Sequence, residues 1–143
     1  MEVKIVAQIN AKEYFDFVIS TIQTIVDVSD VENKTIRKGL KFERSLNTGF
    51  KNELSTVKIL DYVYPRVIEM EYKTSKQTNI NKYLILPKGD NQCEITYTEK
   101  MYDQNNKLKK YNSFIEKGFI KKTEKRMRDV EKYLLEQKKT QEK

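Results

Sequence analysis

The sequence predicts an α+β fold in which a curved, six-stranded antiparallel sheet wraps around a long C-terminal helix. Five segments between residues 40 and 103 alternate apolar and polar residues and are separated by short turn sequences. A first strand and an amphipathic helix precede these segments. The chain ends in one long basic helical pattern. The expected order is therefore strand, helix, an optional short helix, five strands and a final helix.

Length and composition favour one folded domain. The chain has 143 residues, and we expect a single domain over residues 1–137 with a frayed tail at 138–143. Charged residues make up 34% and mean hydropathy is −0.76, yet the apolar residues fall into periodic segments, as in a folded protein. No apolar run approaches the roughly 18 residues of a membrane span, and no signal-peptide core follows Met1. We expect a cytoplasmic protein, and the lone Cys93 agrees with a reducing compartment.

The chain has no histidine, which excludes several kinds of site. A Ser-His or Cys-His nucleophile pair is impossible, and one cysteine without histidine cannot build an ordinary structural zinc site. We expect no metal and no cofactor. Any catalysis would depend on Asp, Glu, Lys, Tyr or water.

The first elements are a strand and a helix. Val3, Ile5, Ala7 and Ile9 alternate with polar residues, which is the period of a half-buried strand. Asn10 is expected to cap a helix that begins at about residue 11. The apolar face of this helix comprises Ala11, Phe15, Val18, Ile19, Ile22, Ile25 and Val26. A short second helix over residues 30–38 is a weaker prediction.

The five later strands are predicted at residues 40–46, 53–64, 66–74, 78–86 and 93–102. Their short links imply antiparallel neighbours. The predicted inward residues are Leu40, Phe42 and Leu46; Val57, Ile59 and Val63; Ile68, Met70 and Tyr72; and Cys93, Ile95, Tyr97 and Met101. The fourth strand is ambiguous, because Tyr83 and Ile85 compete with Ile80, Leu84 and Leu86 for the inward side.

The closing helix is predicted over residues 108–137. Its apolar face comprises Tyr111, Phe114, Ile115, Gly118 and Phe119, and then rotates to Thr123, Met127, Val130 and Leu134. The helix is therefore expected to bend or to change partner near Gly118, since a mid-helix glycine commonly marks a kink or a close backbone approach.

The layout resembles the START-like superfamily, also called helix-grip, polyketide cyclase or SRPBCC-type, and within it a small bacterial family of unknown function. The local matches are residues 10–16 (NAKEYFD), 39–42 (GLKF), 83–87 (YLILP) and 93–97 (CEITY). This resemblance implies an internal cavity between sheet and helix that binds apolar or amphipathic molecules. It also implies occasional enzymes, such as polyketide cyclases.

We therefore expect a binding module whose cavity takes a hydrophobic or amphipathic, lipid-like ligand. The candidate lining residues are Phe42, Arg44, Ile59, Met70, Tyr72, Tyr83, Tyr97, Glu99, Phe114 and Gly118. Arg44 and Glu99 share the apolar faces of their strands and would mark a polar end, which Asn79 and Asn81 would join. The alternative is that Arg44 and Glu99 reach solvent or form a structural ion pair. An enzyme using Glu99 as acid or base, with Arg44 or a tyrosine orienting the substrate, ranks last.

Positive charge is concentrated at the C-terminal end. Residues 107–143 contain 13 Lys and Arg against 6 Asp and Glu, whereas residues 1–106 hold 15 of each. The helical wheel places Lys117, Lys121, Lys125, Arg128 and Lys132 on one basic ridge. This ridge could dock on anionic membrane or nucleic acid. The alternative is a solvated face with Glu124–Arg128 and Lys125–Asp129 pairs. The oligomeric state is left open.

Overall fold

The computed structural model describes residues 1–47 and 52–141, which form six strands and two helices. In chain order these are β1 (Glu2–Ala7), α1 (Ala11–Asp27), β2 (Lys41–Asn47), β3 (Asn52–Val63), β4 (Val67–Lys73), β5 (Gln77–Pro87), β6 (Cys93–Asp103) and α2 (Ser113–Gln141).

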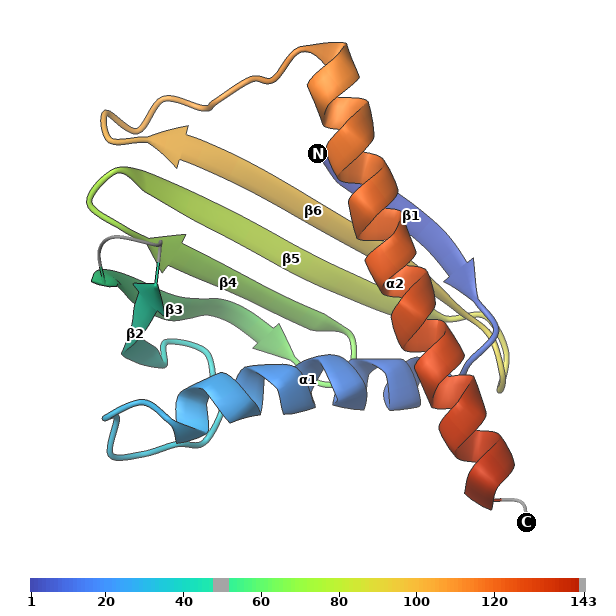
Figure 1. Ribbon diagram of the computed structural model, residues 1–143. Helices are drawn as coiled ribbons and strands as arrows, with labels where there is room; N and C mark the ends of the chain where they lie inside the picture. The colour runs from blue at the N-terminus through green and yellow to red at the C-terminus, as the bar shows by residue number, and fades with distance from the viewer. Residues whose placement is uncertain (48–51, 142–143) are drawn as a thin grey trace.

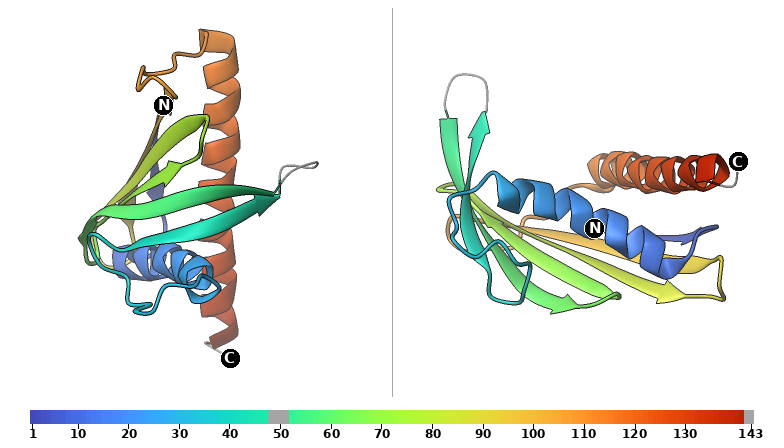
Figure 2. Two further views of the ribbon diagram at one scale, coloured as in Figure 1. Left: turned by 90° about the vertical axis from the view of Figure 1, so that its left-hand side faces the viewer. Right: turned by 90° about the horizontal axis from the view of Figure 1, so that it is seen from below.

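All six strands belong to one antiparallel sheet in the order β1-β6-β5-β4-β3-β2. The five later strands form a meander, and β1 pairs with the last of them (Figure 1). Both helices lie on the concave side of the curved sheet (Figure 2). The predicted fold class and element order are confirmed, except for the optional short helix.

The main core lies between α1 and the concave face of the sheet. The buried side chains of α1 are Ala11, Tyr14, Phe15, Val18, Ile22 and Val26. The sheet opposes them with a fully buried layer that includes Val57, Ile59, Ile85, Cys93 and Ile95. Burying each such side chain stabilises the fold by about 1.5–3 kcal/mol. The period-two pattern of apolar residues therefore determines which face of each strand lies against α1. The side chain of Leu46 lies outside what the structure describes.

The ambiguity of β5 is resolved in favour of Ile85 and Tyr83. Ile85 is fully buried in the core and Tyr83 packs against the core from the concave face. Ile80 and Leu84 instead line a hollow of about 390 Å³ on the opposite face of the sheet. Pairing with β6 fixes this choice, because Ile85 lies opposite Ile95 and Tyr83 lies opposite Tyr97.

A β-bulge in β3 makes the prediction for Val63 wrong. The register with β4 shifts between Ile59 and Asp61, so that one extra residue is inserted into β3. Beyond the bulge the inward side passes to Tyr62, which packs against the core, and Val63 is 51% exposed. A single inserted residue reverses which side chains face inward, and strict alternation cannot anticipate it.

Asn10 caps α1 as predicted. Its side-chain oxygen accepts hydrogen bonds from the backbone N–H groups of Lys12, at 2.9 Å, and Glu13, at 3.3 Å. The predicted short helix at 30–38 is absent, and these residues form an irregular connection. Lys34 supports it by donating from Nζ to the carbonyl oxygens of Asp27 and Ser29. Within the segment the Asn33 side-chain oxygen accepts from the backbone N–H of Thr35 at 3.1 Å, and local bonds of this kind compete with helix formation.

Helix α2 begins five residues later than predicted. Leu108 forms a β-bridge with Tyr102, and the backbone N–H of Lys109 bonds to the carbonyl of Met101. Asn112 then caps the helix by accepting from the N–H of Ile115 at 2.9 Å. At the other end α2 is helical to Gln141, four residues beyond the predicted end at Gln137.

The middle of α2, from Ile120 to Leu135, packs closely on the rest of the protein. Thr123, Met127 and Glu131 are buried there, and the helix contacts β1 and α1. In the first half Phe114 is 85% exposed, and Gly118 is exposed as well. The helix is continuous in Figure 1, so the rotation of its apolar face reflects a loss of partner and not a kink.

Replacing Gly118 with alanine is expected to stabilise the protein by about 0.5–1 kcal/mol, because alanine loses less backbone entropy in a helix. A Cβ at this position would meet no atom within 4 Å. The matched control is Gly39→Ala, where space is equally free but φ is +89°, so alanine should destabilise. Urea unfolding of both variants measures the effect, and a loss of stability for Gly118→Ala would contradict the exposed placement.

Candidate functional site

A cavity of about 390 Å³ lies between α1, strands β4 to β6 and the second half of α2. Most of its lining is apolar. The apolar residues are Phe17, Val18, Ile22 and Ile25 from α1, Ile68 and Met70 from β4, and Met127 and Val130 from α2. A largely apolar concavity of this size is typical of small-molecule sites.

The polar groups of this first cavity gather where β5 and β6 face α2. Asn81, Tyr83, Tyr97 and Arg126 all line it. The rings of Tyr83 and Tyr97 lie 4.8 Å apart between centroids, and the Arg126 guanidinium lies 5.2 Å from the Tyr97 ring centroid. This distance is that of a cation–π contact, which holds the cation against Tyr97 in the lining of the cavity.

The two phenols are held in their neutral form. Burial raises the pKa of Tyr97, and its hydrogen bond to Glu99 raises that pKa further. Burial also raises the pKa of Tyr83, and the nearby positive charge of Arg126 partly opposes the rise. Both hydroxyl groups therefore remain hydrogen-bonding groups at neutral pH and are not bases.

Glu99 is occupied by neighbouring side chains. One carboxylate oxygen accepts from the Tyr97 hydroxyl at 2.7 Å, and the other accepts from Asn79 Nδ2 at 2.8 Å. The carboxylate does not line the first cavity. It lines a second cavity, of about 610 Å³, between β6, residues 108–111 and the first half of α2. Arg126 lines both cavities.

The candidate residues from the sequence are distributed over four environments. Met70, Tyr72, Tyr83 and Tyr97 line the first cavity, and Glu99 lines the second. Phe42 and Ile59 are buried in the core. Phe114 and Gly118 were expected to line the cavity, but both are exposed, because the first two turns of α2 do not pack on the sheet.

Arg44 is half-buried on β2 and is far from Glu99. Three strands separate β2 from β6, and at about 4.8 Å per strand spacing the two backbones are roughly 19 Å apart. Among the described residues no ion pair joins Arg44 and Glu99. The positive charge of Arg44 instead acts on Tyr72. Burial raises the pKa of the Tyr72 hydroxyl, and the charge of Arg44 partly opposes this rise.

Arg126 and the α1 lining residues were not among the sequence candidates. Helical spacing nevertheless contained a signal for Arg126, since it lies three residues after Thr123 and four before Val130, on the edge of the predicted apolar face. Phe17 lay off the predicted apolar stripe of α1, and it contacts Tyr133 of α2 at 5.5 Å between ring centroids.

The predicted basic ridge is partly engaged by the protein itself. All five residues are exposed. Lys125 pairs with Asp129 at 3.1 Å, as expected if the ridge is a solvated helix face with internal ion pairs. Arg128 pairs with Glu131 at 3.0 Å instead of with Glu124, and it also donates to the carbonyl of Val6 at 2.9 Å.

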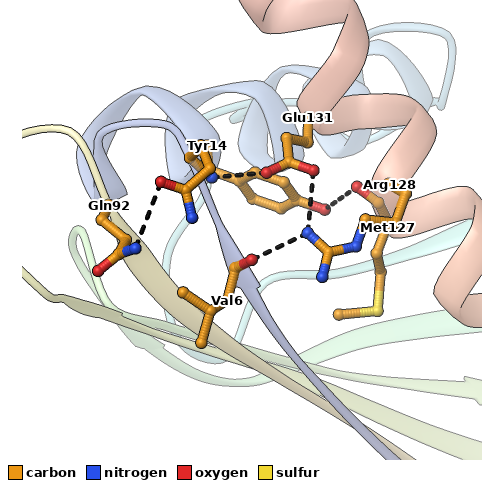
Figure 3. Close-up of polar contacts among 7 residues, drawn as sticks. Val6, Tyr14, Gln92, Met127, Arg128 and Glu131 are labelled. Carbon is orange, nitrogen blue, oxygen red and sulfur yellow. Dashed lines mark hydrogen bonds and ion pairs between the residues drawn. The ribbon is translucent and has the colours of Figure 1, made fainter.

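Figure 3 shows a set of polar contacts that fixes α2 around Met127, Arg128 and Glu131. Arg126 directly precedes these residues, so the same contacts set its position. Glu131, which is 9% exposed, accepts from the backbone N–H of Gln8 and from Arg128. The hydroxyl of the fully buried Tyr14 donates to the carbonyl of Met127 at 3.1 Å. These bonds connect α2 to the end of β1 and to α1, so both cavities have a common fixed wall.

Solved structures with the same fold cover most of the chain. A protein from Rhizobium loti, Mll3558, matches with a TM-score of 0.58 and 13% identity over 91% of this chain and 92% of that one. A conserved protein from Geobacillus kaustophilus matches with a TM-score of 0.58 and 10% identity over 93% of both chains. A point mutant of norcoclaurine synthase from Thalictrum flavum, in complex with a transition-state analogue, matches with a TM-score of 0.56 and 11% identity over 96% and 94%.

At these identities the likeness shows that the fold is shared, and it gives no information about activity. No curated protein sequence matches the chain. No helix in the described ranges 1–47 and 52–141 is long and apolar enough to cross a membrane. One family profile, described as a domain of unknown function (DUF3284), matches residues 1–121. Because that match spans most of the sequence, this chain belongs to the DUF3284 family.

Proposed function

We propose that this protein binds a small hydrophobic or amphipathic molecule in the cavity between α1, the sheet and α2. The observation that supports this most directly is the lining, which is mainly apolar with a few convergent polar groups at one end. The fold shared with norcoclaurine synthase agrees with the START-like superfamily that the sequence resembles.

The composition of the lining favours binding over acid–base catalysis. Among the described residues that line the first cavity there is no carboxylate and no lysine. The tyrosines there have raised pKa values, with burial as the leading cause. A general base would need a pKa near the working pH, and these groups do not supply one.

The alternative of docking on anionic membrane or nucleic acid through the basic ridge has less support. Arg128 is committed to Val6 and Glu131, and Lys125 is paired with Asp129. Lys117, Lys121 and Lys132 are exposed, as charged residues on a solvated helix face usually are.

Filling the cavity should abolish ligand binding without unfolding the protein. Val130 lines the cavity from α2, so Val130→Trp should weaken binding of the neutral fluorescent probe N-phenyl-1-naphthylamine by about tenfold or more, since the indole occupies the ligand's volume. The matched control is Lys132→Trp on the exposed side of the same helix, which should change affinity less than about twofold.

Fluorescence titration measures both affinities. The chain contains no tryptophan, so the indole introduced in each variant is also a single reporter of its own environment. The Val130→Trp variant should emit at shorter wavelength than the Lys132→Trp variant, because its indole lies inside the cavity. Equal probe binding by the two variants, or no binding by the unmodified protein, would contradict the proposal.

A further inference from the structure

The second cavity differs from the first in its charge. Lys100, Lys109, Lys110, Lys122 and Arg126 line it, against only two carboxylates, Glu99 and Glu116. Glu99 already accepts hydrogen bonds from Tyr97 and Asn79. The second cavity therefore has an excess of positive charge and lies directly beside a mainly apolar cavity.

Lys109, Lys110, Lys122 and Arg126 are the cationic groups that the second cavity can offer to a ligand, because Lys100 also lines the hollow on the opposite face of the sheet. Within residues 1–47 and 52–141 none of them lies in an ion pair with a carboxylate. Lys109 Nζ donates only to the amide oxygen of Gln77, at 3.2 Å. Cations grouped around a concave surface raise the local concentration of anions and stabilise a bound anion by charge-assisted hydrogen bonds.

The second cavity also has an exposed apolar wall. Leu108, Tyr111 and Phe119 line it, and they are 47%, 42% and 42% exposed. Tyr111 and Phe119 meet edge to face with ring centroids 5.2 Å apart. Large apolar side chains left this exposed next to unpaired cations fit a ligand that has both an apolar part and a negative charge.

Arg126 joins the two cavities. It lines both, and its guanidinium lies over the Tyr97 ring, whose hydroxyl group reaches Glu99. The order along the protein is therefore an apolar cavity, then Arg126, and then the lysine-rich cavity. Among the described residues, Arg126 is the one cation that lines the first cavity. A negative charge on a ligand is therefore favoured in the second cavity, where the lysines lie.

We propose that the second cavity is the head-group subsite of one continuous site. It takes the carboxylate or phosphate head of an amphipathic anion whose apolar chain lies in the first cavity, with Arg126 contacting the head. This inference rests on the proposed function, because it specifies the class of ligand for the same cavity.

Four ligands with one chain and different heads test the charge preference. Dodecanoate, dodecyl phosphate, dodecanol and dodecyltrimethylammonium are titrated below their micellar concentrations and followed by calorimetry. Both anions should bind about tenfold or more tightly than dodecanol, and the cation should bind most weakly. The relative affinity of the two anions decides which head is preferred, and moderate salt should weaken only the anions.

Two variants and a control locate the subsite. Arg126→Gln should weaken dodecanoate binding about tenfold and dodecanol binding less than about twofold. Lys122→Gln should act in the same direction by about threefold. Lys132→Gln removes an equal charge from α2 but lines neither cavity, and it should leave both affinities unchanged. All three positions are exposed, so thermal unfolding should show folded variants.

The outcomes separate this inference from the proposed function. Equal affinity for dodecanoate and dodecanol would overturn the head-group subsite and leave the apolar cavity standing. A preference for anions that Lys132→Gln reduces as much as Arg126→Gln would overturn its location. Failure of all four ligands and of the neutral probe to bind would overturn the proposed function itself.

Discussion

Replacing Phe15 with alanine is expected to lower the free energy of unfolding by about 3–5 kcal/mol, the range found for truncation of fully buried aromatic side chains. Phe15 is 0% exposed, and its ring contacts those of Tyr62 and Tyr64 at centroid distances of 6.2 and 5.6 Å. It connects α1 to the end of β3, so its loss leaves a cavity at the centre of the helix–sheet interface. Domains are stable by about 5–15 kcal/mol, so this variant should be close to unfolding.

Phe17→Ala is the matched control, because it removes the same group from the same helix. Phe17 is only partly buried and lies at the cavity, against Tyr133. Its truncation should cost roughly 1 kcal/mol. Urea unfolding followed by circular dichroism measures both values. Equal losses for the two variants would show that α1 does not pack on the sheet through the face that carries Phe15.

Replacing Glu131 with alanine is expected to lower the free energy of unfolding by about 2–4 kcal/mol. The Glu131 side chain is 12% exposed, and its carboxylate accepts from the Gln8 N–H and pairs with Arg128. Its loss leaves a partly buried backbone donor without its acceptor and removes the partner of a guanidinium that is 45% exposed. The second half of α2 should then detach more readily from β1.

Two comparisons separate the charge from the acceptor. Glu131→Gln keeps an oxygen that can accept from Gln8 but loses the ionic pair with Arg128, so we expect roughly half the loss. Glu136→Ala, on the exposed side of the same helix, should change stability by less than about 0.5 kcal/mol. Hydrogen exchange should show faster opening of α2 in Glu131→Ala, a smaller increase in Glu131→Gln and none in Glu136→Ala. Unchanged exchange in Glu131→Ala would mean that these contacts do not anchor the helix.

The sheet was predictable from sequence to within a few residues at most of its strand ends. Inward residues such as Phe42, Ile59, Met70 and Ile95 followed from alternation, because a one-residue slip would have moved every apolar side chain into water. The error at Val63 arose from the bulge near Ile59, which no local pattern marks. The start of α2 was misjudged because Leu108 and Lys109 pair with the end of β6, a contact made by tertiary folding.

The candidate site was less predictable than the fold. Tyr83 and Tyr97 could be proposed from their strand positions, but the distance between Arg44 and Glu99 depends on strand order. The role of Arg126 depends on where α2 crosses the sheet, and the contacts of Glu131 and Tyr14 with distant parts of the chain set that crossing. Such contacts link residues more than a hundred positions apart.

The sequence by itself determined the α+β class, the antiparallel meander, the capped first helix and the basic C-terminal helix, because periodicity, turn residues and caps are local. Only the tertiary structure decided that the first two turns of α2 are left exposed, that β3 reverses its faces, and that Arg126 lines two cavities. Those features depend on the position and rotation of each element relative to its neighbours. The packing of residues that are distant in sequence sets both.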